Sequence, residues 1–117
     1  MLAVGEHVLG EVGDSLLRAT TGLGGGTGLT YHELCGAFTS GVLIIGAHCG
    51  RTHPAVDDAP CQELVRRFRS RFRKHFDTLD CHVLREEKFG SGGQAPCSVL
   101  VEQAAQILLD VLAGSSV

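Results

Sequence analysis

The chain has 117 residues, of which 44% are hydrophobic and 20% charged. This length suits one hydrophobic core, and the balance excludes an intrinsically disordered chain, so we expect a single domain over residues 1–117. The net charge of −3 predicts no general attraction to nucleic acid.

Two short helices are expected first, over Leu2 to Leu9 and Asp14 to Leu23. The segment from Gly22 to Gly28 follows, and its five glycines exclude a helix, because each costs about 1 kcal/mol relative to alanine there. We expect a flexible or tightly turned loop that matches neither a dinucleotide-binding nor a Walker pattern. Aromatic residues make up only 5% of the chain, which predicts a core filled by Leu, Val, Ile and Ala.

A central helix is predicted over about residues 31–49. Thr30 and Glu33 have the spacing of a capping box at its start, and Gly50 suits its end. The helix is apolar nearly all round, which predicts a buried position. Ala37 and Gly41 lie four residues apart, so we expect a close approach by a neighbouring helix.

Two further helices complete the expected fold. Asp57 or Asp58 is expected to cap the first, with Pro60 in its opening turn. Its apolar positions recur at helical spacing, and six of the ten basic residues, between Arg66 and Lys74, fill the other face. Pro96 precedes the last helix, which runs to about Leu112. The predicted fold class is all-α, a compact bundle of five or six helices around the central one.

The chain shows no sign of secretion or of a membrane span. Residues Met1 to Glu6 lack the basic start of a signal peptide. The longest apolar run, around Gly41 to Ala47, is far shorter than the roughly 20 residues that cross a bilayer. We therefore expect a cytoplasmic protein. Five cysteines in that compartment indicate reactive thiols, metal ligands or buried side chains rather than structural disulfides.

The cysteines differ in their expected surroundings. Cys61 and Cys97 fall in the first turn of a helix, which favours the thiolate. Cys35 would share a helix face with His32, whose imidazolium would lower the thiol pKa. Cys49 would lie about 21 Å from Cys35 along one continuous helix, too far for a disulfide within the chain. No Cys-x-x-Cys is present, so any metal site would have to combine distant residues.

Several segments in order resemble the C_GCAxxG_C_C family, which is named for its cysteine pattern. They are Gly24 to Gly28, the Cys35-Gly-Ala-Phe-Thr-Ser-Gly41 stretch with Gly46, Gly50 and Arg51 after it, Phe68 to Phe76, Leu79 to Leu84, and Cys97 to Ala105. The resemblance covers roughly Leu2 to Leu112. It implies a small helical redox-active protein related to split-Soret cytochrome domains.

The resemblance also implies which thiols matter. The motif cysteines fall on Cys35, Cys81 and Cys97, whereas Cys49 and Cys61 lie outside the pattern. The family's first cysteine normally precedes a segment like Leu2 to Gly10. Its absence here leaves two alternatives: the true start lies upstream, or this member has lost one redox partner.

Three functions remain open from the sequence. The first is thiol–disulfide or electron-transfer chemistry in which Cys35 meets Cys81 or Cys97, with His32 tuning the thiolate, and with a redox partner protein that the sequence does not name. The second is a transition-metal or iron–sulfur module, although the sequence requires no cofactor. The third is a structural oligomer with inert buried thiols. A homodimer is expected, because a second copy would cover apolar surface or complete a site.

Overall fold

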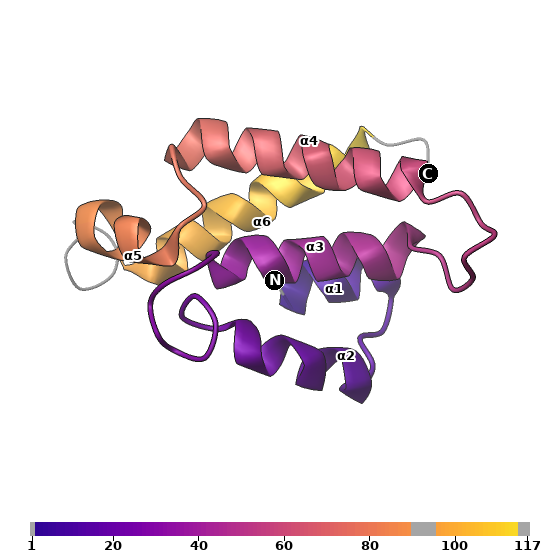
Figure 1. The fold of residues 1–117 in the computed structure, drawn as a ribbon, viewed down its shortest axis with the longest axis horizontal. Helices are drawn as coiled ribbons and strands as arrows, with labels where there is room; N and C mark the ends of the chain where they lie inside the picture. The colour runs from indigo at the N-terminus through magenta and orange to yellow at the C-terminus, as the bar shows by residue number, and fades with distance from the viewer. Residues whose placement is uncertain (1, 90–95, 115–117) are drawn as a thin grey trace.

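The computed structural model describes residues 2–89 and 96–114, and their regular structure is helical (Figure 1). The elements are α1 (Leu2–Leu9), α2 (Asp14–Thr20), a 3₁₀ turn η1 (Thr21–Leu23), α3 (Gly36–Cys49), α4 (Ala59–Phe76), α5 (Cys81–Val83), a π-helical turn η2 (Leu84–Lys88) and α6 (Cys97–Ala113). The prediction of an all-α bundle is confirmed. None of the described helices is both long and apolar enough to cross a membrane.

The central position of α3 is also confirmed, since this helix packs against α1, α4 and α6. Its predicted start at residue 31 is wrong. Tyr31 and Glu33 have positive φ angles of 62° and 67°, and Leu34 pairs with Asp80 in an isolated antiparallel bridge. The backbone before Gly36 is therefore used for pairing with another segment, and the capping box of Thr30 and Glu33 does not form.

The core is built around phenylalanine rather than around aliphatic residues alone. All five phenylalanines are buried, and their rings contact one another in a continuous row: Phe38, Phe68, Phe72, Phe76 and Phe89. Three of them come from the predicted apolar stripe of α4. The prediction that aliphatic side chains fill the interior was thus incomplete, because a few large rings occupy its centre.

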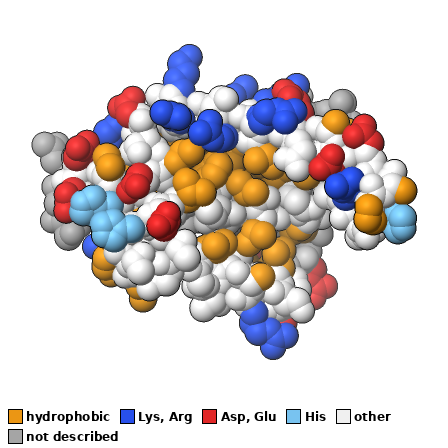
Figure 2. Space-filling model, viewed as in Figure 1, with side chains coloured by type: hydrophobic (Ala, Val, Ile, Leu, Met, Phe, Trp, Pro, Cys, Tyr) orange, Lys and Arg blue, Asp and Glu red, His pale blue; other side chains and the backbone are white. Residues whose placement is uncertain are grey.

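The outer face of α4 is basic and exposed. Figure 2 shows Lys and Arg side chains gathered along this helix, and all six basic residues between Arg66 and Lys74 are exposed. Glu63 pairs with two of them, at 3.1 Å from Arg66 and 3.4 Å from Arg67. The N-cap residue of the helix is Asp58, whose side chain makes no capping hydrogen bond, whereas the preceding Asp57 carboxylate accepts a hydrogen bond from the Ala59 amide at 3.0 Å.

Gly41 makes room for the Phe68 ring. A Cβ atom built on Gly41 would fall against that ring, 2.7 Å from its Cζ atom, and Phe68 is fully buried. The close approach that the sequence predicted at Gly41 is therefore made by the ring of Phe68 from α4.

We predict that Gly41→Ala destabilises the fold, whereas Gly46→Ala in the same helix does not. The added methyl at position 41 overpacks the core, at a cost of about 1–3 kcal/mol. Gly46 is exposed with open space around its would-be Cβ, so alanine there should be neutral or stabilise by about 0.5–1 kcal/mol. Urea unfolding of both variants measures the difference, and equal stabilities would contradict the proposed contact.

Candidate thiol site

A pair of backbone hydrogen bonds joins the segments that carry Cys35 and Cys81. The Cys35 amide donates to the Leu79 carbonyl at 2.7 Å, and the Cys81 amide donates to the Glu33 carbonyl at 2.9 Å. Leu34 and Asp80 lie opposite each other between these bonds. In such antiparallel pairing the next residues along, here the two cysteines, project on the same face as diagonal neighbours, typically about 7–8 Å apart.

The segment after the bridge is fixed at both ends. The Asp80 carboxylate accepts hydrogen bonds from the amides of His82 and Val83, at 2.8 and 3.4 Å, and so starts the helical turn at Cys81. At the far end the Lys88 ammonium donates to the Phe76 carbonyl at 2.9 Å and to Asp77 at 2.7 Å. Residues 81–88 are therefore held against the end of α4.

The glycine-rich segment is a tightly turned loop that packs against Cys81. Its turns are closed by backbone bonds from Gly28 to Gly22 and from Tyr31 to Gly25, at 2.9 and 2.8 Å. Gly26 has a φ of +72°, and a Cβ built on it would lie 2.7 Å from the Cβ of Cys81. Glycine is required here for backbone conformation and for close approach.

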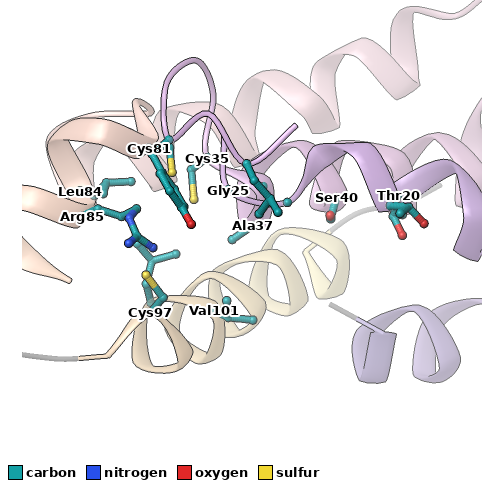
Figure 3. A pocket seen from close by; sticks show the side chains of 16 residues that line it. Thr20, Gly25, Cys35, Ala37, Ser40, Cys81, Leu84, Arg85, Cys97 and Val101 are labelled. Carbon is teal, nitrogen blue, oxygen red and sulfur yellow. The ribbon is translucent and has the colours of Figure 1, made fainter. Parts of the chain in front are cut away.

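These segments enclose a cavity of about 460 Å³ that three of the five cysteines line (Figure 3). Cys35 stands at the N-cap of α3, Cys81 begins α5 and Cys97 begins α6. In Figure 3, Cys35 and Cys81 lie beside each other, Cys97 faces them from α6, and Arg85 lies on the same side as Cys81. Cys35 and Cys81 are buried, and Cys97 is half-buried.

The surroundings keep two of these thiols protonated. Burial raises the pKa of Cys35, and the nearby Cys97 adds to this effect, whereas the amides of Ala37 and Phe38 oppose it. Burial likewise raises the pKa of Cys81, followed by the effect of Cys35. The Arg85 guanidinium acts in the opposite direction on the Cys81 pKa. It lies 4.0 Å from the centre of the Tyr31 ring, which holds the side chain in place.

His32 is not among the residues that line the cavity. It lies outside α3, so it does not share a helix face with Cys35 as expected. Its ring stacks on that of His82, with 4.8 Å between the ring centres, and His82 Nε2 lies 3.3 Å from the Glu86 carboxylate. The structure thus brings together Cys35, Cys81 and Cys97, and it places His32 in a different cluster.

The family described as "Putative redox-active protein (C_GCAxxG_C_C)" matches residues 1–111 of the chain. The chain belongs to the C_GCAxxG_C_C family. Comparison with curated proteins and with solved structures gave no match. The cysteines that the resemblance assigned to the C_GCAxxG_C_C pattern are the same three that line the cavity.

The described residues do not fit a metal centre. In the ranges 2–89 and 96–114, no three His, Cys, Asp or Glu side chains are grouped so that they could hold one metal ion. The three thiols share a cavity, but they do not form a ligand set. We therefore derive no chemistry through a metal or an iron–sulfur cluster.

Sequence reasoning missed two residues of this site, Arg85 and Tyr31. Tyr31 lies inside the capping-box pattern of Thr30 and Glu33, which gives no sign of this contact, and Arg85 is 54 positions further along the sequence. The Tyr31 ring reaches Arg85 because the glycine-rich loop is tightly turned. Neither helical nor strand periodicity in the sequence predicts the shape of this loop.

We predict that Gly26→Ala exposes the Cys81 thiol and lowers stability more than Gly10→Ala does. Both glycines have positive φ, +72° and +81°, so both substitutions strain the backbone, by about 1–3 kcal/mol. Only the methyl at position 26 would also meet Cys81 and the His32 carbonyl, since Gly10 has open space. Alkylation of Cys81, mapped by mass spectrometry, should accelerate in Gly26→Ala alone. An unchanged rate would show that the loop does not shield the thiol.

Proposed function

We propose that this protein is a thiol–disulfide redox protein in which Cys35 and Cys81 interconvert between a dithiol and a disulfide. The observation that carries the proposal is the backbone bridge between residues 33–35 and 79–81, which holds the two thiols on one face at the cavity.

The bridge favours Cys35 and Cys81 over the other pairings at the cavity. A disulfide joins Cα atoms up to about 6.8 Å apart, slightly less than the typical separation of diagonal neighbours. A small movement of the two segments would therefore close the bond. Cys97 comes from α6, which contributes no backbone bond to this bridge, so it lacks the same restraint.

The exchange proceeds in two balanced steps. The Cys81 thiolate attacks one sulfur of a partner protein's disulfide, forms a mixed disulfide and expels the other partner sulfur as a thiolate. The Cys35 thiolate then attacks Cys81 Sγ and expels the first partner sulfur. The partner disulfide is reduced to two thiols, and the two cysteines are oxidised to one disulfide. Protons released by the cysteines are taken up by the partner thiolates or the solvent.

Arg85 supports the assignment of Cys81 as the attacking thiol. Its positive charge faces Cys81 and lowers the thiol pKa against the effect of burial. It therefore stabilises the thiolate that the first step requires. We class Arg85 as a positioning residue, because it acts through Cys81. We assign His32 no role in this exchange, because its ring stacks on that of His82.

The first test is a redox titration of the whole protein in glutathione buffers, with free thiols alkylated and mapped by mass spectrometry. We expect a Cys35–Cys81 disulfide to form reversibly near the cytosolic glutathione potential, roughly −220 to −320 mV. Cys35→Ser and Cys81→Ser should abolish this bond.

The matched control for this titration is Cys49→Ser, which removes a thiol outside the cavity and should leave the Cys35–Cys81 bond intact. A bond between Cys97 and either cysteine in its place would refute the assigned pair. Thiols at 35 and 81 that remain free under oxidising buffer would refute thiol redox chemistry at this site. Circular dichroism of each variant checks that it is folded.

A second test addresses Arg85. Replacing it by Gln removes the charge that lowers the Cys81 pKa, so the pH profile of Cys81 alkylation should move to higher pH. Arg85→Lys keeps the charge and should largely restore the profile. A profile that is the same in all three proteins would show that Arg85 does not stabilise the Cys81 thiolate.

A further inference from the structure

The two cysteines outside the family pattern form a second thiol pair. Cys49 is the last residue of α3, and Cys61 lies in the first turn of α4. The two helices are joined by the loop of residues 50–58 and lie next to each other at this end (Figure 1). Burial raises the pKa of the Cys49 thiol, and the Cys61 side chain lies close enough to raise it further.

The positions of both thiols are fixed by other contacts, at Cys49 by a hydrogen bond and at Cys61 by burial. The Cys49 thiol also donates to the Ile45 carbonyl one turn earlier, at 3.3 Å, and Cys61 is buried in the core with 9% of its surface exposed. Cys49 is half-buried and packs against the same core.

The connecting loop is held in a closed conformation by Arg51. Its guanidinium donates to the carbonyls of Pro54 and Val56, at 3.0 and 2.9 Å, and lies 3.7 Å from the Asp58 carboxylate. These bonds hold the loop that joins the end of α3, where Cys49 lies, to the start of α4, where Cys61 lies.

We propose that Cys49 and Cys61 are a second redox site, a dithiol that closes to a disulfide and clamps α3 to α4. This inference is independent of the proposed function, because the two sites lie at opposite ends of α3, about 21 Å apart along the helix axis. That separation excludes exchange between the pairs within one chain.

The oxidant is a low-molecular-weight disulfide such as oxidised glutathione. One thiolate of the pair attacks it and expels one glutathione thiolate, which leaves a mixed disulfide. The second cysteine, as thiolate, attacks the protein sulfur of that mixed disulfide and expels the other glutathione thiolate. The two cysteines lose two electrons and two protons, and oxidised glutathione becomes two molecules of glutathione.

The reduced pair should react slowly near neutral pH. Burial, with the hydrogen bond to Cys61 and its charge, raises the pKa of Cys49 to about 11. Closure that begins with attack by Cys49 would therefore be slow and require long exposure to oxidised glutathione. Once closed, the bond restrains the unfolded chain across the loop and stabilises the fold.

The test uses the whole wild-type protein, incubated with oxidised glutathione, alkylated and digested without reductant. We expect a peptide that joins Cys49 to Cys61. The folding equilibrium constant, measured by urea unfolding, should increase on the order of a hundredfold and return to its reduced value with dithiothreitol. In Cys49→Ser and in Cys61→Ser the joined peptide and the added stability should both disappear.

Cys35→Ser is the variant that separates the two sites, because it removes the cavity disulfide and should leave the Cys49–Cys61 peptide unchanged. Three results would overturn the proposal: free thiols at 49 and 61 after oxidation, stable glutathione adducts on either one, or a bond from either one to Cys35, Cys81 or Cys97. Because peptide mapping is done on the wild-type protein, poor folding of a variant does not prevent a decision.

Discussion

The thiol site depends on two backbone hydrogen bonds, between Cys35 and Leu79 and between Cys81 and Glu33. Among the described residues, these two bonds join the Cys35 and Cys81 segments directly. The neighbouring contacts hold the two segments in this pairing. Asp80 starts the turn that follows, Lys88 secures the end of that turn to α4, and Gly26 lets the wound loop lie against Cys81. The positive φ angles at Tyr31 and Glu33 are the local strain that accompanies this pairing. A helix extended back to residue 31 would pair the Cys35 amide within the helix, and the Leu79 carbonyl would lose this partner.

The sequence predicted the parts of the fold that repeat with a helical period. Helical periodicity predicts which side chains of a helix share a face. The apolar stripe of α4 and the apolar surface of α3 therefore predict which sides of these helices are buried. The start of α3 was not predictable in this way. Thr30 and Glu33 satisfy the capping pattern, yet the competing partner, the carbonyl of Leu79, is more than forty residues away in sequence. Likewise, the small number of aromatic residues concealed the fact that all five phenylalanines share one core.

The site was predictable only in part for the same reason. Resemblance to the C_GCAxxG_C_C family selected Cys35, Cys81 and Cys97, and the first-turn positions of Cys61 and Cys97 followed from Pro60 and Pro96. No local spacing shows that these cysteines meet, since each comes from a different element. The sequence excluded a bond from Cys35 to Cys49, but the positions of Cys49 and Cys61 carry a signal of their own. Two cysteines at the ends of consecutive helices, with a short loop between them, must lie near each other if the helices pack side by side.

Charge determines how the proposed thiol exchange would proceed at the cavity lined by Cys35, Cys81 and Cys97. A buried thiolate is costly because the surroundings solvate it poorly, and burial accordingly raises the pKa of both Cys35 and Cys81. The dithiol is neutral and so is the disulfide, which means that neither stable state places a negative charge in the cavity. In the proposed exchange, negative charge arises only while a sulfur attacks, and the Arg85 guanidinium, itself held by the Tyr31 ring, would stabilise the thiolate at Cys81. The apolar cavity would favour the two neutral end states, and Arg85 would lower the cost of the charged step between them.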